Sequence, residues 1–375
     1  MADGVLRGFE AGRAPETATA PARRCVSHTP VGFKAVPCLH PTTMNMLVDG
    51  EWRTDAYDAT DETGAFDRQE AAFRDRIEDD PDARFRPEAG RYHLYVSHAC
   101  PWAHRTLLVR ALTGLEDAVS VDVVDPYRAD DGWQFTPEKD GCTADSLHGR
   151  DYLREVYTAA DPEFTGRVTV PVLWDRREGT IVNNESAEIL RMLDTAMAGV
   201  AARDVDLYPA GYRDEVDRII DAIYEPVNNG VYRAGFADTQ AAYDAAVDDL
   251  FEALAHWDAV LADQRYLAGD RLTEADLCLF TTLVRFDQVY HTHFKCNVRQ
   301  VHEYDTLWPY LRDLYQTPGV AGTVEMGHIK EHYYTTHPSV NPKGLVARGP
   351  DLDFAAPHDR DALPGGPPEA LVAGA

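Results

Sequence analysis

The residue pattern of the chain changes at Tyr208-Pro209, and this change limits the folds that the chain can adopt. Between residues 92 and 205, runs with the period of a strand alternate with runs with the period of a helix. Residues 213–330 hold helical runs, and no strand-like run interrupts them. This order predicts an α/β domain followed by a separate all-α domain.

The α/β part begins with a strand at residues 92–96, which a turn and a helix follow. Pro171 lies within the third predicted strand and predicts either an edge strand or a special turn, because proline cannot donate to a sheet. The polar stretch 125–165 is long for a loop, which favours a functional role or a short helix of its own. The predicted strands are 92–96, 119–124, 168–174 and 180–183, and the predicted helices are 102–112 and 187–197.

The all-α part contains a capping-box start at Thr273-Glu274-Ala275-Asp276. Its predicted helices are 213–224, 239–263, 274–289, 306–316 and 320–331. The segments outside both parts lack such periodicity. The predicted organisation is a flexible arm (1–43), an extension packing on the first domain (44–89), an α/β domain (90–205), an all-helical domain (206–335) and a tail with a mobile end (336–375).

Acidic residues dominate the charge of the chain, with 41 Asp and 22 Glu against 31 Arg and 5 Lys, a net charge of −27. This balance argues against nucleic acid or an anionic membrane as a partner. An excess of short acidic side chains with almost no lysine indicates a protein of a salt-loaded cytoplasm, where salt screens the self-repulsion. The alternative is an ordinary acidic cytosolic protein. No apolar run reaches membrane-spanning length and no secretory signal is found, so we predict a cytoplasmic location.

The six cysteines are widely spaced, without a CxxC pair or zinc-type spacing. Cys100 differs from the others because it stands between a predicted strand and the predicted helix 102–112, with Pro101 placed where a first helical turn best tolerates proline. Free N–H groups at a helix N-terminus stabilise a thiolate and lower its pKa. The alternative is a buried, inert cysteine, which is our interpretation of the other five. Since no second thiol follows Cys100, an external thiol must resolve any disulfide that it forms.

Two further features suit a peptide-like thiol. Thr169-Val170-Pro171 places a proline, often cis in thioredoxin-like domains, where the preceding backbone can pair with such a ligand. Asn184-Glu185-Ser186 stands at a predicted helix start and can bind an amino-acid head group with both charges. The alternative for that segment is a plain N-cap. With Cys100, these features predict a site for a γ-glutamyl thiol such as glutathione.

Several long segments, in the same order, resemble the glutathionyl-hydroquinone reductases, the Xi class of glutathione transferases. They include YHLYVSHACPWAHRTLLVRALTGLED, TVPVLWDRREGTIVNNES, VNNGVYRAGFA and GHIKEHYY, and the resemblance spans roughly residues 46–350. It implies a thioredoxin-like domain, an all-helical domain and a homodimer. It also implies that Cys100 attacks the sulfur of a glutathionyl-hydroquinone and that a second thiol then resolves the mixed disulfide. No metal or permanently bound cofactor is implied.

The resemblance also implies roles for individual residues. Tyr232 resembles the proton donor of the family, and Tyr290 and Tyr333 resemble the tyrosines that lower the thiol pKa. The adjacent Tyr334 leaves the last assignment open by one position. The residues that resemble the site of the thiol cosubstrate are Trp133, Arg167, Val168, Thr169, Val170, Glu185 and Ser186.

Three alternatives stay open at this point. The first concerns the thiol: a salt-adapted host such as a haloarchaeon favours γ-glutamylcysteine in place of glutathione, and both thiols share the γ-glutamyl end. The second is the activity of a general thioltransferase or dehydroascorbate reductase. The third is a ligand-binding relative without catalysis. His328 and His332 have a metal-capable spacing, but the HExxH glutamate is missing, which favours a non-metal role.

Overall fold

The computed structural model describes residues 43–373. The flexible arm predicted over 1–43 therefore lies outside the described residues, apart from Thr43. Among the helices that are described, none combines the length and the apolar character needed to cross a membrane.

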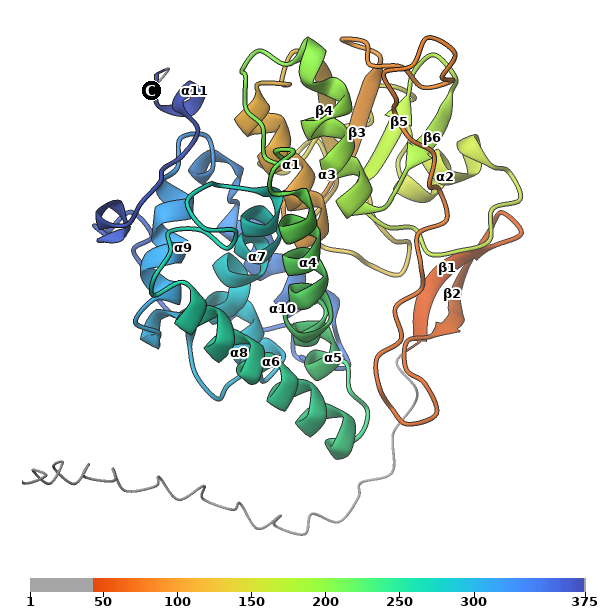
Figure 1. The fold of residues 1–375 in the computed structure, drawn as a ribbon. Coiled ribbons are helices and arrows are strands. Elements are labelled where there is room, and N and C mark those ends of the chain that lie inside the picture. Colours follow the sequence, from red (N-terminus) through yellow and green to blue (C-terminus); the bar gives the residue numbers. More distant parts are fainter. Residues whose placement is uncertain (1–42, 374–375) are drawn as a thin grey trace, which may run out of the picture. The chain divides into compact units, whose positions relative to one another are not determined.

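The α/β domain is built on a four-stranded sheet in the order β4-β3-β5-β6 (Figure 1). The central strand β3 pairs in parallel with β4 and antiparallel with β5, which pairs antiparallel with β6. All five residues of β3 are buried, as expected for a strand that is covered on both faces. The helices α1 and α3 pack against each other, and α2 packs beside β6. The elements are β3 (Tyr92–Val96), α1 (Pro101–Thr113), β4 (Val119–Val123), α2 (Leu153–Ala160), β5 (Val172–Asp175), β6 (Thr180–Asn183) and α3 (Ser186–Asp194).

These elements confirm the predicted order, with two differences. The stretch 125–165 contains the short helix α2, which the length of the loop had favoured. The third strand begins only at Val172, after a cis Val170–Pro171 bond, and β5 lies between β3 and β6. Pro171 therefore marks a turn, and the edge-strand alternative is wrong, because the proline precedes the first paired residue and removes no ladder hydrogen bond.

The extension contains a hairpin that was not predicted, formed by β1 (Thr43–Val48) and β2 (Glu51–Asp58). Its two-residue turn is Asp49-Gly50, with φ of 49° and 75°. Asp-Gly is a strong signal for such a turn, because both residues must adopt positive φ. A side chain at Gly50 would meet the Pro162 carbonyl oxygen at 2.0 Å, so glycine is also required by space. Between the end of β2 and the start of β3, the extension contains no helix or strand.

The second domain is all-helical, as predicted, and the buried helix α7 lies at its centre (Figure 1). Every residue of α7 is buried, which is typical of a helix surrounded by others. The predicted capping box is confirmed: Asp276 accepts hydrogen bonds from the Thr273 backbone N–H at 2.9 Å and from its hydroxyl at 3.0 Å. The α-helices are α4 (Arg213–Ile223), α5 (Gly230–Gly235), α6 (Gln240–Val260), α7 (Glu274–Arg285), α8 (His291–His293), α9 (Leu307–Gln316), α10 (Met326–Thr336) and α11 (Glu369–Val372).

The helical predictions differ from the structure where the helices are irregular. The predicted helix 274–289 ends as α7 at Arg285 and continues as a π-helical turn, η3 (Phe286–Tyr290). The predicted helix 320–331 is displaced, since α10 starts only at Met326. The short helix α5 was not predicted, and it follows a second π-helical turn. These irregular turns matter because η3 ends at Tyr290 and the other turn precedes α5, which carries Tyr232.

The tail is held on the helical domain as far as it is described. Arg360 is buried and donates hydrogen bonds to the backbone carbonyls of Leu261, Gln264 and Arg265. Arg265 in turn pairs with Asp361 of the tail at 2.8 Å. These hydrogen bonds and this ion pair hold the segment around Arg360 on the helical domain, and the mobile end of the tail stays a prediction.

Candidate active site

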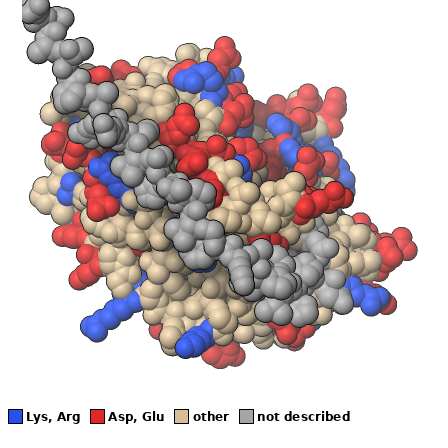
Figure 2. Space-filling model, turned by 90° about the horizontal axis from the view of Figure 1, so that it is seen from below, with Lys and Arg blue, Asp and Glu red and all other residues tan. Residues whose placement is uncertain are grey.

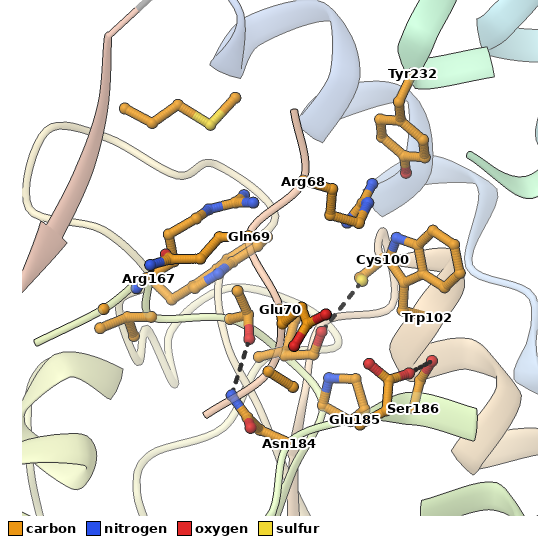
Figure 3. Close-up of a pocket in the computed structure, with 18 of the residues that line it drawn as sticks. Arg68, Gln69, Glu70, Cys100, Trp102, Arg167, Asn184, Glu185, Ser186 and Tyr232 are labelled. Carbon is orange, nitrogen blue, oxygen red and sulfur yellow. Dashed lines mark hydrogen bonds between the residues drawn. The ribbon is translucent and has the colours of Figure 1, made fainter. Parts of the chain in front are cut away.

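Cys100 caps the N-terminus of α1, directly after the turn that follows β3. Its backbone is extended, and Pro101 occupies the first helical turn, where its missing N–H costs nothing. The half-buried thiol lies 3.5 Å from the Val170 carbonyl oxygen, to which it donates a hydrogen bond (Figure 3). The predicted strand–turn–helix setting of Cys100 is thus confirmed.

Burial outweighs the helix N-terminus in setting the acidity of this thiol. Burial raises the pKa of Cys100, whereas the N–H groups of Trp102 and Ala103 and the guanidinium groups of Arg285 and Arg68 lower it. The predicted lowering by the helix N-terminus is thus present, but burial is the larger effect and the net direction is upward. Sequence position does not reveal how completely a thiol is removed from water.

Arg285, at the end of α7, places a positive charge beneath the Cys100 turn. It donates hydrogen bonds to the carbonyls of Ala99 at 3.0 Å and His98 at 2.9 Å, and it contacts the His104 ring at 3.0 Å. No carboxylate within residues 43–373 forms an ion pair with it. Burial lowers the pKa of His98 to about 4 and that of His104 as well, so neither histidine brings a charge to Cys100 at neutral pH. Through Arg285, the helical domain therefore fixes the turn before Cys100 in the α/β domain.

The predicted thiol-binding segments face Cys100. Val170 presents its carbonyl to the thiol, immediately before the cis proline. Glu185 is the N-cap of α3, and its carboxylate accepts hydrogen bonds from the Ala187 N–H at 3.2 Å and the Ser186 hydroxyl at 3.4 Å. The plain N-cap alternative is thus present, and the same two side chains also line the cavity.

One cavity unites the predicted site. All seven residues predicted for the thiol cosubstrate line it together with Cys100. The buried Trp133 stacks on His332, which also lines the cavity, with ring centres 5.2 Å apart. Arg167 reaches the cavity beside Gln69, whose side-chain oxygen accepts the Arg167 backbone N–H at 3.3 Å.

The three predicted tyrosines form a hydrogen-bonded chain next to Cys100. The hydroxyls of Tyr232 and Tyr333 lie 2.5 Å apart, and those of Tyr333 and Tyr290 lie 3.0 Å apart. Tyr232 and Tyr333 line the cavity, whereas Tyr290 lies behind them. Tyr334 instead donates to the Gln288 carbonyl at 3.1 Å, so it is Tyr333 that joins the cluster.

Burial raises the pKa of all three tyrosines, so their hydroxyls are protonated donors at neutral pH. Their hydroxyls form hydrogen bonds with one another, and within residues 43–373 none of them bonds to the Cys100 sulfur. The role of Tyr290 and Tyr333 in lowering the thiol pKa therefore stays a prediction.

The N-terminal extension supplies site residues that sequence reasoning missed. Arg68, Gln69 and Glu70 line the cavity, and the segment that carries them crosses its mouth (Figure 3). Arg128, from the long loop before α2, also lines it, and burial lowers the pKa of its guanidinium to about 10. Because the extension has no periodicity, only its abundant aromatic and charged side chains could have indicated that it contributes to the site.

His328 and His332 each donate a ring N–H to a backbone carbonyl. His328 contacts the Asp140 carbonyl at 2.8 Å, and His332 contacts that of Pro126 at 2.6 Å. His332 also lines the cavity. Their shared helix α10 therefore anchors the loop that carries Arg128 and Trp133.

A thioredoxin-like domain with a cysteine at its first helix, a cis proline facing it and an all-helical second domain defines a glutathione transferase. Models of the glutathione S-transferase N-terminal and C-terminal domains match residues 99–196 and 240–313. The glutathionyl-hydroquinone reductase YqjG of Escherichia coli K12 is 48% identical over 85% of this chain and 99% of its own length. The corresponding enzyme PcpF of Sphingobium chlorophenolicum is 51% identical over 82% of this chain and 96% of its own length.

The solved structures agree. A Xi-class transferase from Natrialba magadii is 70% identical, with a TM-score of 0.82 over 87% of this chain and 99% of that one. The glutathione-bound structure of YqjG has a TM-score of 0.77 over 84% and 99% of the two chains. The chain belongs to the glutathionyl-hydroquinone reductases, the Xi class of the glutathione transferases.

Proposed function

We propose that this chain removes a glutathionyl or γ-glutamylcysteinyl group from hydroquinones through a mixed disulfide at Cys100. The observation that carries the proposal is the position of the Cys100 thiol. It lies between a peptide-like binding edge at Val170 and a group of tyrosine hydroxyls, of which those of Tyr232 and Tyr333 reach the same cavity. The proposed reaction needs the edge at Val170 to bind the thiol and the tyrosine hydroxyls to protonate the aromatic ring.

The reaction proceeds through two thiol exchanges. In the first, the Cys100 thiolate forms an S–S bond with the sulfur of the adduct. The bond between that sulfur and the ring breaks, and the ring carbon gains a proton. In the second, a free thiol attacks the mixed disulfide and restores Cys100 as a thiolate. The products are the free hydroquinone and the oxidised thiol.

The aromatic wall of the cavity favours a hydroquinone over a general thioltransferase substrate. Trp102 stacks on Tyr232 with ring centres 6.4 Å apart, and Tyr224 and Phe236 extend the same wall. Such a surface gains little from a small aliphatic disulfide, whereas it can bind a flat ring. Tyr232, with its hydroxyl protonated, is the proposed donor to that ring.

The two candidate thiols differ at one end only. Glu185 and Ser186 suit the γ-glutamyl head that both share. Arg128 and Arg167 line the cavity with Trp133 and suit a carboxylate at the other end. Relatives have been solved with glutathione bound, from Escherichia coli and from Saccharomyces cerevisiae. We therefore propose glutathione or γ-glutamylcysteine as the cosubstrate, with no permanently bound cofactor.

The setting of the enzyme is also a proposal. Within residues 43–373, all four cysteines are free thiols, which suits a reducing cytoplasm. Cys25 and Cys38 lie outside the described residues. The homodimer implied by the family resemblance stays a prediction, to be checked by light scattering in molar KCl.

The function is tested by turnover of a glutathionyl-menadiol adduct in molar KCl, with glutathione or γ-glutamylcysteine as the second thiol. We expect release of free menadiol by the wild type and none by Cys100→Ala. The thiol with the higher kcat/KM identifies the cosubstrate. Cys278→Ala is a matched control, because Cys278 is buried in α7 and does not line the cavity. Equal release by wild type and Cys100→Ala would overturn the proposal.

A further inference from the structure

Arg68 reaches the aromatic end of the cavity from the N-terminal extension. Its guanidinium carbon lies 4.8 Å from the ring centre of Trp102 and 5.0 Å from that of Tyr232. Figure 3 shows the side chain extending from the segment that crosses the cavity toward the space beside Tyr232. The positive charge therefore lies where the ring of an aromatic substrate would be bound.

The hydrogen bonding of Arg68 leaves part of the guanidinium available. Its Nε donates to the Asn229 side-chain oxygen at 2.9 Å, which fixes the orientation of the planar group. Among the side chains that the structure describes, its two terminal nitrogens have no hydrogen-bond partner, and no carboxylate forms an ion pair with it. This is unusual in a chain with 63 acidic and 36 basic residues. A half-buried arginine without a carboxylate is ready to bind an anionic ligand.

The proposed reaction generates an anion at this place. Tyr232 donates its proton to the sulfur-bearing ring carbon and takes one back from the neighbouring ring hydroxyl, which becomes a carbonyl. When Cys100 attacks the sulfur, the electron pair of the C–S bond returns through the ring to this oxygen. The oxygen becomes a phenolate and then takes a proton from water, so the adduct loses sulfur and gains hydrogen.

We propose that Arg68 donates hydrogen bonds to this ring oxygen and stabilises the phenolate as the C–S bond breaks. The inference rests on the proposed function and adds a catalytic residue to it. The extension thus completes the catalytic site of a thioredoxin-like domain. A donor that is already oriented when the charge develops contributes more than one that must reorganise.

The competing role for Arg68 is binding of a carboxylate of the thiol. That role predicts a raised KM for the thiol with every substrate. The phenolate role predicts a loss of kcat that appears only when a hydroquinone must leave. The two roles therefore separate when one variant is measured on two substrates.

The experiment compares Arg68→Met, Arg68→Lys and the wild type on glutathionyl-menadiol and on the mixed disulfide of glutathione and 2-mercaptoethanol. We expect Arg68→Met to lower kcat on the adduct about 100-fold, the usual cost of losing one such donor. Turnover of the disulfide should change by less than about threefold, since no phenolate forms. The kcat of Arg68→Lys on the adduct should lie between the values for the wild type and Arg68→Met. Arg76→Met is the control, because Arg76 is in the same extension but pairs with Glu188 away from the cavity.

A series of adducts with increasingly chlorinated rings gives a second readout. If Arg68 stabilises the phenolate, the rate of Arg68→Met should depend more steeply on the pKa of the departing hydroquinone than that of the wild type. A purely structural role would leave this slope unchanged and would overturn the inference. So would an equal loss on both substrates or no loss on the adduct. If the wild type turns over the disulfide but not the adduct, the proposed function itself fails, and this inference with it.

Discussion

At the scale of single residues, the arrangement around Arg285 bears most directly on the reactivity of Cys100. Removing a guanidinium from water without a carboxylate partner is costly. Three backbone carbonyls, those of His98, Ala99 and Thr281, receive its hydrogen bonds instead. This leaves a net positive charge beneath the Cys100 turn, which favours the thiolate over the thiol.

Replacing Arg285 should therefore raise the pKa of Cys100 further. We expect iodoacetamide to alkylate Cys100 at least tenfold more slowly in Arg285→Met than in the wild type at pH 7. A tenfold change corresponds to a shift of about one unit in the pKa of the thiol. Arg285→Lys, which keeps the charge, should lose less. The pH dependence of iodoacetamide alkylation measures this, with circular dichroism as the control for folding. An unchanged pH profile in a folded Arg285→Met would contradict the account.

Tyr232 has a role that two substrates can separate. Tyr232→Phe removes the hydroxyl but keeps the ring on Trp102. We expect kcat on a glutathionyl-hydroquinone to fall by about 100-fold, because the ring carbon loses its proton donor. Reduction of a small mixed disulfide should change little, since no carbon is protonated. Tyr334→Phe is the matched control, as its hydroxyl bonds to Gln288 outside the cavity. Equal losses on both substrates would count against the role.

Much of this site could be predicted from local sequence. Cys100, Val170-Pro171 and Glu185-Ser186 each stand at the junction of a strand or turn with its neighbouring element, where backbone geometry alone defines their use. Arg285 and Arg68 could not be predicted in this way. Each is a long side chain whose position depends on how distant segments pack, and no local pattern encodes that.

At the scale of elements, the junction of α3 with the linker to the helical domain holds a carboxyl group out of water. Asp194 ends α3 and is buried, and one of its oxygens accepts the Leu207 N–H at 3.2 Å. Its other oxygen has no hydrogen-bond partner among the described residues. Burial raises the pKa of Asp194 to about 7. The folded state thus prefers the protonated form, and this preference links stability to pH.

The sign of that dependence follows from the raised pKa. The contribution of Asp194 to stability is fully present below the unfolded pKa near 4 and is lost as the pH rises through about 7. The full shift corresponds to roughly 4 kcal/mol. We expect the unfolding midpoint of the wild type to fall from pH 5 to 8 at constant molar KCl. The unfolding midpoint of Asp194→Asn should fall less over this pH range. The midpoint of Asp204→Asn, which changes an exposed residue, should fall as much as that of the wild type. Parallel curves for all three would refute the assignment.

Elements were predicted well where the periodicity is regular along the whole element, as in β3, β6 and α4. They were missed where a short element depends on one turn or on packing. The hairpin at Asp49-Gly50 depends on two positive φ angles, and α5 is a short helix between two irregular segments. The displaced start of α10 follows from a turn at residues 321–323 that interrupts the helical period.

At the scale of the whole molecule, the acidic surface is the dominant feature. Figure 2 shows one face on which Asp and Glu side chains appear at more places than Lys and Arg. A net charge of −27 creates self-repulsion that opposes folding. Salt reduces it, because the screening length falls from about 30 Å at 0.01 M to about 3 Å at 1 M.

The stability of the protein should therefore increase with salt. We expect the thermal unfolding midpoint to rise by several degrees between dilute buffer and 2 M KCl, with most of the rise at low concentration where screening changes fastest. Sucrose at equal osmolality separates screening from general exclusion effects. A flat response to KCl, or an equal rise with sucrose, would contradict the interpretation of the composition as an adaptation to salt.

The two-domain organisation was predictable because it depends on a change of period over more than a hundred residues, which single irregular turns do not obscure. The limits of the domains remain predictions. What sequence could not reveal at this scale is that the extension, the helical domain and the thioredoxin-like domain all contribute to one cavity.

The mixed disulfide at Cys100 is the central claim, and a single-turnover experiment tests it most directly. The enzyme is mixed with one equivalent of glutathionyl-menadiol without free thiol, and the products are analysed by intact-protein mass spectrometry and chromatography. The account predicts one equivalent of free menadiol and one glutathionyl group on Cys100, which added glutathione then removes. Release of menadiol without a gain in protein mass, or the same gain in Cys100→Ala, would contradict it.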